Sequence, residues 1–555
     1  MSVRLATTCR RFGTGYGRID RPDCGGPVWP GKQSVSLASG RRAVWQGDEV
    51  NLLVLNAGSS SLKYTLFRLL GHGPVAESEE ILAAGEVERV GTAGSRLVPA
   101  GVPSGAGTGK SAATDGLHGV PTPAVAAAPH GKSPDGGVPT ASSAGDSREP
   151  ANFRRASDMT VDESDAGERG EPPDASGGTA ISAAEDDSEA ADAGGAAAAL
   201  HSGPAAEEGE PVGASTAGDA ARLLIRRLVG GLAGVTVRID AVAHRIVHGG
   251  LHFCGPARIT EAALAALHEL CDIAPLHNPS GVEGIDAARE ALPGVPNVAV
   301  FDTAFHHDLP AVAAEYALPR DLAARLSLRR YGFHGISYRY VVESALNLLE
   351  RPAAGTRLVV CHLGSGASVC AVRDGRSVDT SMGFTPIEGL IMATRPGDLD
   401  PGLLTYLLRT GQLTVEQLDG VLNHESGLLG LSGLSGDVRD LDAEAARGSA
   451  HAVLALECFA YRVRKYVGAY AAVLGGVDAV VFTGGIGERS PATRARICQG
   501  MEFLGLGVDA DRNAAADGRQ PVPIGARDPE RVLVVPTDEQ RQIAREAFAL
   551  LHQSE

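Results

Sequence analysis

The 555-residue sequence lacks any apolar run long enough to cross a membrane, and it lacks a C-x-x-C pair. A membrane-spanning helix needs about 18 or more consecutive apolar residues, so no membrane partner is expected. Eight cysteines are scattered along the chain, and four of them, Cys271, Cys361, Cys370 and Cys458, stand in apolar surroundings. We therefore expect buried free thiols rather than a disulfide framework, and a cytoplasmic protein.

The sequence also has fewer basic than acidic residues. The 50 Lys and Arg residues face 67 Asp and Glu residues, which gives a formal net charge of -17. Such a balance argues against a nucleic acid or an anionic membrane as partner. The length exceeds that of a single domain, so two domains with additional segments are expected.

Two segments contain little that could form a core. Residues 1–48 are rich in Arg, Gly and Pro, and we predict a disordered tail. An organelle transit peptide is the alternative, but Asp20, Asp23 and the Gly and Pro content argue against it; an over-long gene model would look the same. From about 92 to 218 the chain is rich in Ala, Gly, Ser, Pro, Asp and Glu and has one aromatic residue, Phe153. We predict a disordered insertion there, because so little apolar surface cannot offset the entropy of ordering.

One stretch of this insertion resembles a phosphate-binding loop. Residues 104–111 read SGAGTGKS, which nearly matches the Walker A pattern. Ser104 replaces the first glycine, and the stretch lacks the strand before it and the helix after it that the motif requires. We interpret the match as coincidence.

Two Gly/Ser turns, each between short apolar strands, organise the rest of the chain. Residues 52–67 read LLVLNAGSSSLKYTLF, and residues 358–372 read LVVCHLGSGASVCAV. Glycine lets backbone amides approach an anion, and hydroxyls with Lys63 suit phosphoryl oxygens or a metal-bound phosphate. A polar hairpin turn is the alternative for either copy alone. Together the two copies predict a duplicated domain with a phosphate loop in each half, closing on one nucleotide.

Charged residues stand at the ends of two predicted strands. Arg245 lies at the end of a strand over 240–246, before a glycine pair, where its guanidinium can bind a carboxylate or phosphoryl group as a fork. Asp302 follows a buried strand over 297–301. Open sheets bind ligands at strand ends, which favours an active-site role for Asp302; a helix cap for the residues that follow is the alternative.

A histidine and a second arginine follow. His334 is flanked by glycines at 332 and 335, which predicts a tight turn, and the pattern leaves a functional and a structural histidine equally open. Arg395 lies in GLIMATRPGDLDP (389–401), where Pro396 and Gly397 prevent a helix. Two guanidiniums would suit a transferring phosphoryl group, whose charge spreads over its oxygens.

Two further turns and several other elements complete the prediction. SGLSGDVR (432–439) ends in an Asp-x-Arg pair, and a strand over 479–483 runs into GGIGE (484–488). These glycines would allow adenine to lie on the backbone, although a plain strand-to-helix turn is the alternative. The remaining pattern predicts helices over 223–232, 260–271, 450–474 and from about 539 to 551, and a strand over 532–536.

These residues fall into nine motifs that resemble those of the acetate kinase family, in the same order. They are NAGSSSLK at Asn56, HRIVHGG at His244, APLHNP at Ala274, FDTAFH at Phe301, YGFHG at Tyr331, HLGSGAS at His362, ATRPGDLDP at Ala393, GGIGE at Gly484 and PTDE at Pro536. The resemblance covers about 51–91 and 219–555. It implies an α/β fold, the duplicated RNase H-like fold of actin, the Hsp70 ATPase and sugar kinases, with two lobes around a nucleotide cleft.

The resemblance also implies a division of the chain. The tail, 1–48, would precede an N-terminal lobe over 49–302 that is interrupted at about 92–218. A C-terminal nucleotide-binding lobe would cover 303–539, and a final helix within 540–555 would return to the N-terminal lobe.

The implied activity is reversible, Mg²⁺-dependent, direct in-line phosphoryl transfer between ATP and acetate, giving acetyl phosphate and ADP. It would serve acetyl-CoA biosynthesis, with Mn²⁺ as a substitute metal and with a homodimer as the assembly.

The implied catalytic residues are Asp302, His334 and Arg395, and the implied metal ligands are Asn56 and Glu539. The implied substrate-binding residues are Arg245, Val247, Leu276, His277, Phe333 and Pro386. The implied nucleotide-binding residues are Ser59, Ser60, Ser61, Lys63, His362, Leu363, Gly364, Ser365, Gly366, Asp437, Val438, Arg439, Gly485, Ile486, Gly487, Glu488 and Arg489.

Two positions depart from the family pattern. Ser365 stands where the family usually has Asn, and Arg489 stands where it often has Asn. Neither belongs to the acid, arginine or metal set, so we expect retained activity with a shifted nucleotide affinity.

Two alternative functions are kept. A propionate or butyrate kinase would differ only in the depth of the acyl pocket, and the forms NAGSSSLK and APLHNP favour the two-carbon acid. An ATP-dependent binding module, such as a chaperone or an actin-like filament, has no reason to keep two arginines, two histidines and an acid together.

Overall fold

The structure is a computed structural model that describes residues 49–58, 60–92, 94–100, 210–231 and 237–553. All of them belong to one compact unit. The predicted tail, the Walker-like stretch and most of the predicted insertion lie outside the described residues. Within the described ranges, no helix combines the length and the apolar composition that a bilayer crossing requires.

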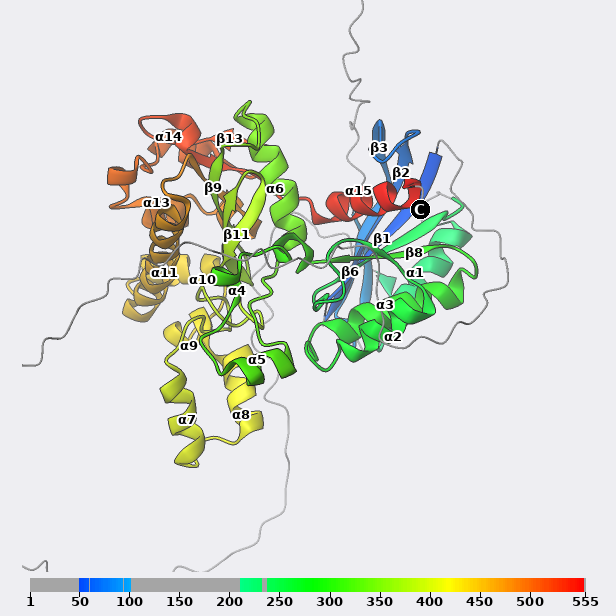
Figure 1. The fold of residues 1–555 in the computed structure, drawn as a ribbon, viewed down its shortest axis with the longest axis horizontal. Coiled ribbons are helices and arrows are strands. Elements are labelled where there is room, and N and C mark those ends of the chain that lie inside the picture. Colours follow the sequence, from blue (N-terminus) through cyan, green and yellow to red (C-terminus); the bar gives the residue numbers. More distant parts are fainter. Residues whose placement is uncertain (1–48, 59, 93, 101–209, 232–236, 554–555) are drawn as a thin grey trace, which may run out of the picture. The chain divides into compact units, whose positions relative to one another are not determined.

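The first sheet, as far as the structure describes it, has eight strands in the order β5-β4-β3-β2-β1-β6-β8-β7. In chain order they are β1 (Glu49–Ala57), β2 (Ser61–Leu70), β3 (Ser78–Glu88), β4 (Arg96–Ala100), β5 (Glu210–Pro211), β6 (Ala241–Ile246), β7 (Ala257–Arg258) and β8 (Asn297–Phe301). Figure 1 labels β1, β2, β3, β6 and β8 of this sheet.

The second sheet has six strands in the described part of the chain, in the order β11-β10-β9-β12-β14-β13. They are β9 (Arg357–Leu363), β10 (Ala367–Arg373), β11 (Arg376–Thr380), β12 (Ala479–Thr483), β13 (Val522–Pro523) and β14 (Val532–Val534).

The two sheets repeat one pattern of strand pairing. In the first, β3, β2 and β1 pair antiparallel, β1 is followed by parallel β6 and β8, and antiparallel β7 lies at the edge. In the second, β11, β10 and β9 pair antiparallel, β9 is followed by parallel β12 and β14, and antiparallel β13 lies at the edge. This repetition confirms the predicted α/β fold with an internal duplication.

Helices cover both faces of the first sheet. Successive residues of a strand point to opposite faces, and β1 is apolar on both. Leu53 and Leu55 pack in a cluster with α1 (Ala217–Gly230) and α3 (Asn278–Ala291). Leu52 and Val54 pack in another with the C-terminal helix α15 (Glu539–His552), which contacts β1, β2, β6 and β8 (Figure 1).

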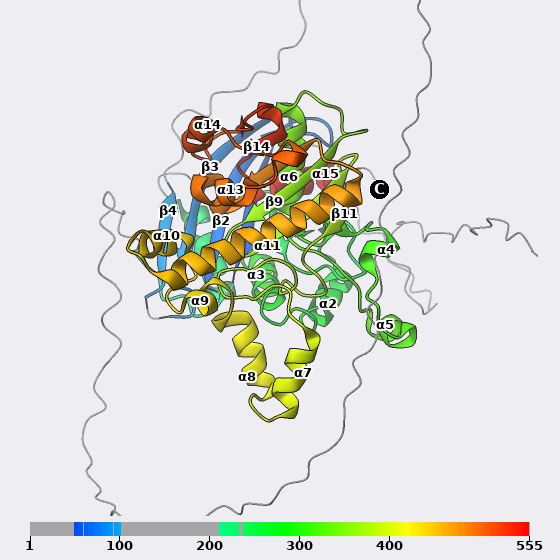
Figure 2. The same cartoon turned by 90° about the vertical axis from the view of Figure 1, so that its left-hand side faces the viewer.

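The second sheet is covered in the same way. The long helix α11 (Ala450–Leu474) packs on β9 and β10 and runs across the sheet in Figure 2. Helix α6 (Gly335–Leu348) packs on the opposite face, in a cluster with Leu358 and Val360 of β9. Helix α6 also contacts α15, so it joins the core of the second sheet to a helix of the first.

The other helices and turns are shorter. They are α2 (Glu261–Glu269), α4 (Ala311–Ala314), α5 (Arg320–Leu326), α7 (Pro401–Arg409), α8 (Val415–Gly420), α9 (Gly427–Ser432), α10 (Val438–Ala446), α12 (Gly484–Arg489), α13 (Pro491–Cys498), α14 (Ala510–Ala515), the 3₁₀ turns Ala304–His306, Glu502–Leu504 and Pro529–Arg531, and the π turn Val421–Glu425.

Regular structure extends into both ends of the predicted insertion. Strand β4 pairs with β3 and buries Leu97, and β5 pairs with β4. Helix α1 begins at Ala217, where the Thr216 side chain accepts a hydrogen bond from the Asp219 backbone, and it ends at Gly230 instead of Leu232. The predicted insertion, 92–218, therefore included β4, β5 and the first residues of α1. The two strands form because neighbouring strands supply their hydrogen-bond partners.

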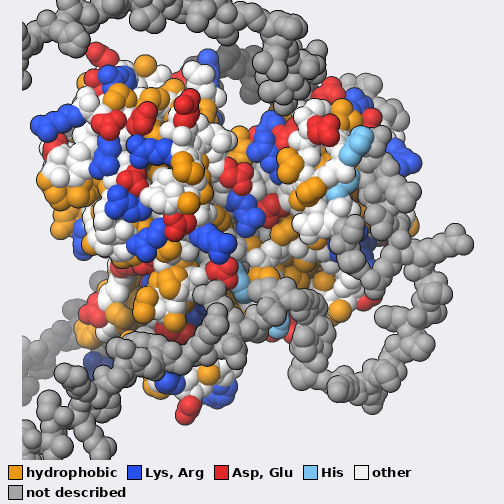
Figure 3. Space-filling model, turned by 45° about the horizontal axis from the view of Figure 1, so that its top comes forward, with side chains coloured by type: hydrophobic (Ala, Val, Ile, Leu, Met, Phe, Trp, Pro, Cys, Tyr) orange, Lys and Arg blue, Asp and Glu red, His pale blue; other side chains and the backbone are white. Residues whose placement is uncertain are grey.

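The cysteine predictions hold only in part. Cys361 and Cys370, on β9 and β10, are buried free thiols. Cys271, in the turn after α2, and Cys458, on α11, are also free, but they are only partly buried. On the described part of the face shown in Figure 3, acidic and basic side chains are interspersed, so the net negative charge is not gathered into one patch there.

Candidate active site

Three polar side chains meet where adjacent strands of the first sheet end. Arg245 is the penultimate residue of β6, Asp302 follows β8, and Asn56 is the penultimate residue of β1. The Arg245 guanidinium donates to both Asp302 carboxylate oxygens, from Nε at 3.1 Å and from Nη2 at 2.6 Å. Its Nη1 donates to Asn56 Oδ1 at 3.1 Å. Asp302 is 1% exposed and makes this fork-to-fork pair, so its expected active-site position is favoured over the helix-cap alternative.

Charges reinforce this cluster. Burial raises the pKa of Asp302, and the Arg245 guanidinium offsets part of that rise. For Arg245, burial opposes ionisation, but the charges of Asp302 and Glu539 raise its pKa above the usual value. Glu539 begins α15 and also acts on Asp302. The fold thus brings Asn56 and Glu539, which are far apart in sequence, to the same arginine.

Two histidines stack beside this cluster. His334 has a φ of 60° and stands directly before α6, which confirms the tight turn predicted from its flanking glycines. Its ring lies on that of His362, with centroids 4.2 Å apart and planes 22° apart. Burial, followed by the charges of His362, Arg245 and Arg395, lowers the pKa of His334 well below its usual value. Burial also lowers the pKa of His362 to about 4, so both rings are neutral near pH 7.

Arg395 reaches the same histidine from a loop. Its Nη1 donates to the Pro386 carbonyl at 2.7 Å, and burial lowers its pKa. A Cβ added to Gly366 would lie 3.0 Å from Arg395 Nη2 and 3.3 Å from His334 Nε2. The second Gly/Ser turn therefore passes close to both the guanidinium and the imidazole, and a side chain at position 366 would crowd them.

His277 links the two arginines. It stands directly before α3, and burial, then Arg395, then Arg245 lower its pKa to about 4. Both guanidiniums thus act on His277 and on His334. The sequence prediction of two positive groups in one site is consistent with this arrangement.

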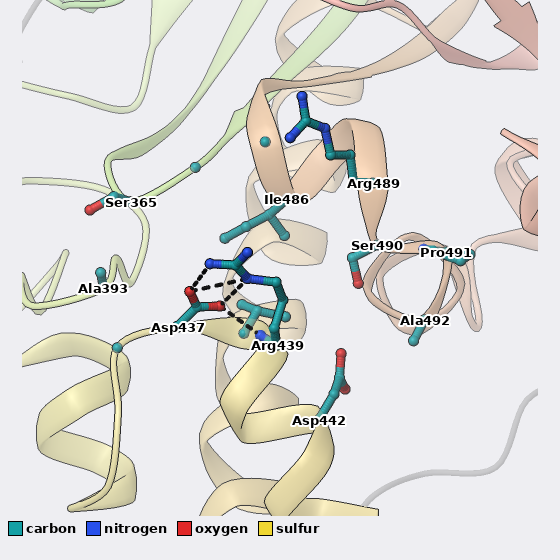
Figure 4. A pocket seen from close by; sticks show the side chains of 14 residues that line it. Ser365, Ala393, Asp437, Arg439, Asp442, Ile486, Arg489, Ser490, Pro491 and Ala492 are labelled. Carbon is teal, nitrogen blue, oxygen red and sulfur yellow. Dashed lines mark hydrogen bonds and ion pairs between the residues drawn. The ribbon is translucent and has the colours of Figure 1, made fainter. Parts of the chain in front are cut away.

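A cavity of about 640 Å³ opens beside the second Gly/Ser turn (Figure 4). Eight of its lining residues belong to the predicted nucleotide set: Gly364, Ser365, Asp437, Val438, Arg439, Gly485, Ile486 and Arg489. The other lining residues, which the sequence analysis missed, are Ala393, Gly436, Asp442, Ser490, Pro491 and Ala492. Each of these lies within a few residues of a recognised motif, so proximity to the motifs was the available signal.

The side chains of the cavity face one another across it. In Figure 4, Ser365 and Ala393 lie on one side, and Ile486, Ser490 and Pro491 on the other. Asp437 caps α10 and pairs with Arg439, whose Nη2 lies 2.6 Å from Asp437 Oδ2. The Arg439 side chain is 84% exposed, so this pair lies at the open side of the cavity.

Some predicted nucleotide residues do not present their side chains to the cavity. Leu363 belongs to the core under the second sheet. The Glu488 carboxylate accepts hydrogen bonds from the backbone of Gly484 and of Thr537, each at 3.0 Å, so it ties the end of β12 to the segment after β14. His362, Gly366 and Gly487 are likewise not lining residues. The side chains of Leu363 and Glu488 are used within the fold, and contact of these two residues with a nucleotide stays a prediction.

The first Gly/Ser turn is a hairpin between β1 and β2. The Gly58 backbone donates to the Ser61 carbonyl at 2.8 Å, and Lys63 stands opposite Asn56 in the register. Ser59 lies outside the described residues. Ser60 and Lys63 are exposed and Ser61 is partly buried, and none of these three lines the cavity at the second turn.

The predicted acyl pocket is brought together only in part. Val247 packs against the cluster that contains buried Phe333, and Pro386 is held at Arg395 through its carbonyl. The His248 ring, which was not predicted, packs on the Phe333 ring with centroids 5.7 Å apart. Leu276 is 41% exposed, so it stands at the margin of this apolar group.

The predicted metal ligands have suitable chemistry. Mg²⁺ prefers hard oxygen ligands and keeps several waters, so one or two protein oxygens with substrate phosphates suffice. Asn56 Oδ1 and the Glu539 carboxylate are such oxygens; Asn56 Oδ1 accepts a hydrogen bond from Arg245, and the charge of Glu539 raises the pKa of the same guanidinium. The described residues contain no group of three or more His, Cys, Asp or Glu that could hold a metal by itself. The pair therefore fits a metal that arrives with a phosphate.

Comparisons with known proteins agree with this geometry. The acetokinase family model matches residues 205–545. Acetate kinase of Heliobacterium modesticaldum is 53% identical over 314 residues, which cover 56% of this chain and 78% of that protein. Acetate kinase of Clavibacter sepedonicus is 53% identical over 311 residues, with the same two shares.

Solved structures extend the similarity beyond the family match. Porphyromonas gingivalis acetate kinase is 32% identical with a TM-score of 0.63, covering 89% of this chain and 98% of that one. A propionate kinase from Francisella tularensis is 29% identical with a TM-score of 0.65, covering 90% and 98%. The chain therefore belongs to the acetokinase family.

Proposed function

We propose that this protein is an acetate kinase that transfers the γ-phosphoryl group of ATP reversibly to acetate. The observation that carries the proposal is the convergence of two guanidiniums on the neutral rings of His277 and His334, beside a cavity lined by glycine turns. Phosphoryl transfer needs positioning and charge stabilisation more than covalent chemistry, and this arrangement supplies both.

Each polar group then has a role. Asp302 holds Arg245 in a fork, so that Arg245 can present its outer donor, which lies at Asn56, to a carboxylate or acyl phosphate oxygen. Arg395 and His334, which flank Gly366, donate to the oxygens of the phosphoryl group in transit. A buried guanidinium and a preorganised donor are worth more in such a site than in water.

The metal belongs to the nucleotide side of the proposal. Asn56 and Glu539 would hold Mg²⁺, or Mn²⁺ in its place, and the ion would neutralise charge on the phosphates. The cavity beside Gly364 and Gly485 would receive the rest of ATP or ADP. Ser60, Ser61 and Lys63 would reach the phosphates from the first turn.

The apolar group of Val247, Phe333 and Pro386 would receive the acyl methyl. A missing or extra methylene in such a pocket is worth about 1 to 3 kcal/mol. Propionate should therefore be a poorer but real substrate, and butyrate poorer still. The likeness to the propionate kinase from Francisella tularensis makes propionate the alternative that needs testing.

The hydroxamate assay for acyl phosphate, run with acetate, propionate and butyrate, tests the proposal. We expect the highest kcat/KM with acetate, and no product without Mg²⁺. A higher kcat/KM with propionate would reassign the acyl specificity, and no acyl phosphate from any of the three acids would refute the kinase assignment.

Direct transfer can be tested separately. Single turnover with γ-labelled ATP in the absence of acetate should leave the protein unlabelled, because the site needs no phospho-enzyme to bring donor and acceptor together. A stable phospho-Asp or phospho-Glu that passes its label to acetate would replace the direct route.

Assembly, location and domain limits are part of the same proposal. The family resemblance supports a cytoplasmic homodimer that serves acetyl-CoA biosynthesis, with lobes over 49–302 and 303–539. Light scattering after size exclusion would measure the mass in solution, and a monomer of 57.0 kDa would contradict the dimer.

A further inference from the structure

Two buried hydroxyls form a hydrogen-bonded chain that begins at His334 Nδ1. Ser368 Oγ, on β10, lies 2.8 Å from His334 Nδ1, and the Tyr338 hydroxyl lies 2.5 Å from Ser368 Oγ. Tyr338 follows His334 by four residues, so α6 places it one turn away on the same side. Both Ser368 and Tyr338 have 0% exposure, and water does not reach the chain they form.

The direction of this chain follows from counting hydrogens. Each hydroxyl has one hydrogen to donate. Burial raises the pKa of the Tyr338 phenol well above its usual value, so the hydroxyl keeps its hydrogen, and Ser368 Oγ lies at hydrogen-bond distance from it. The tyrosine therefore donates to Ser368 Oγ, and Ser368 donates to His334 Nδ1. The opposite direction would leave the Tyr338 hydrogen without an acceptor inside the core, which is costly.

The state of the His334 ring then follows. The ring is buried and neutral, so it has one N–H. Because Nδ1 accepts from Ser368, the hydrogen is on Nε2. Nε2 is the atom that faces Gly366 and the Arg395 guanidinium.

We propose that Ser368 and Tyr338 are positioning residues that fix His334 in the Nε2–H form, so that it meets the transferring phosphoryl group as a hydrogen-bond donor. The role toward phosphoryl rests on the proposed function, whereas the tautomer is a property of the protein alone. Without the hydroxyl chain, the ring could present an Nε2 lone pair to a phosphoryl oxygen, which repels it.

The stacked neighbour provides a control. His362 Nδ1 lies 2.8 Å from the hydroxyl of Ser337, another fully buried serine, on α6. Ser337→Ala and Ser368→Ala each remove one buried hydroxyl from one of the two stacked histidines. Only the second removal touches His334.

Nitrogen NMR of ¹⁵N-histidine-labelled protein tests the tautomer without any need for activity. The His334 signal is assigned by its loss in His334→Gln. In the unmodified protein we expect a protonated Nε2 and an unprotonated Nδ1 at pH 7.5. Ser368→Ala should give averaged shifts from both forms, and Ser337→Ala should leave the His334 shifts unchanged. A protonated Nδ1 in the unmodified protein would overturn the proposal, whatever the kinase assay shows.

Kinetics test the consequence. Losing one neutral hydrogen bond corresponds to roughly a fivefold change, so Ser368→Ala should lower kcat about fivefold with KM for acetate and ATP within about twofold. Tyr338→Phe keeps the ring volume and should lower kcat less. In addition, His334→Gln, whose amide nitrogen reaches the Nε2 position, should retain more activity than His334→Asn, which reaches Nδ1. If Ser368→Ala raised KM for acetate and ATP equally and left kcat unchanged, the result would contradict the positioning role. A His334→Asn variant more active than His334→Gln would contradict it as well.

Discussion

The two sheets share a strand order but differ in what stands at their strand ends. In the first, β1, β6 and β8 end near Asn56, Arg245 and Asp302, and these side chains bond to one another. In the second, β9 and β12 end at glycine turns, and a cavity opens between them. The same topology therefore places charged groups at the strand ends of the first sheet and a cavity at the strand ends of the second.

Glycine makes the space in the second sheet. Gly484 has a φ of 75°, and a Cβ there would lie 2.7 Å from the Leu363 carbonyl oxygen. Only glycine lets the chain turn so closely against β9. The comparison indicates that duplication provides two equivalent strand-end sites, one lined by glycine turns and one by charged groups, and under the proposed function these would divide nucleotide binding from phosphoryl chemistry.

The largest predicted effect comes from removing charge. Arg395→Ala should lower kcat by about 10² to 10³, the usual cost of losing one preorganised donor to a transition state, while the fold stays intact because the Arg395 guanidinium donates to a single carbonyl. Arg439→Ala, which removes an exposed arginine at the cavity, should instead raise KM for ATP. Equal kcat values for Arg395→Ala and the unmodified protein, with matching circular dichroism, would refute the role of Arg395.

The next effect comes from filling the space. A Cβ at Gly485 meets no atom within 4 Å, so Gly485→Leu should fold and extend into the cavity. We expect KM for ATP to rise roughly tenfold, about 1.4 kcal/mol, with KM for acetate nearly unchanged. Gly468→Ala, on α11 and equally open, is the control. Unchanged nucleotide binding in Gly485→Leu, measured by calorimetry, would place the nucleotide elsewhere.

A smaller effect should come from Ser365→Asn, which restores the usual family residue. Ser365 is exposed at the tip of the second turn and lines the cavity. One added amide hydrogen bond should lower KM for ATP about fivefold. An unchanged KM would show that this departure from the family pattern does not affect the nucleotide.

A separate effect concerns stability against pH. Burial lowers the pKa of five histidines to about 4: His244, His248, His277, His306 and His362. Their unfolded forms bind protons near pH 6.5, so the unfolded chain holds more protons between about pH 4 and 6.5. The free energy of unfolding should therefore fall as the pH drops through this window. Urea titrations at pH 7.5, 6 and 5 would measure it.

Two histidine variants, one at a buried and one at an exposed position, test the cause of this pH dependence. His244→Gln removes a buried ring from β6 and should reduce the dependence on pH, whereas His268→Gln, at an exposed position on α2, should not. A stability that rises on acidification would contradict the prediction.

Local pattern was enough for much of the fold. The strands over 297–301 and 479–483 and the helix over 450–474 have the predicted limits, because apolar runs, helical periodicity and flanking glycines act over a few residues. The predicted first and last residues were wrong where a strand or helix depends on partners that are distant in the sequence. Strand β4 forms because β3 lies beside it, and nothing in its five residues shows that.

The site was predictable as a set of residues but less so as an arrangement. Turn chemistry marked His334, and strand ends marked Arg245 and Asp302. The hydroxyl chain of Ser368 and Tyr338 was missed, although a serine in an otherwise apolar strand was a signal. The exposed position of Leu276 and the internal use of Glu488 had no signal in the sequence.

The sequence by itself determined the family, the two glycine turns and the chemical types of the active groups, because these are carried by short motifs. The tertiary structure decided that Asn56 and Glu539, 483 positions apart, both interact with Arg245, the first by a hydrogen bond and the second through its charge, and that Arg245 and Arg395 act on the same histidines. Those relations depend on how α6 and α15 pack against the sheets, and packing of distant segments is not encoded in any one of them.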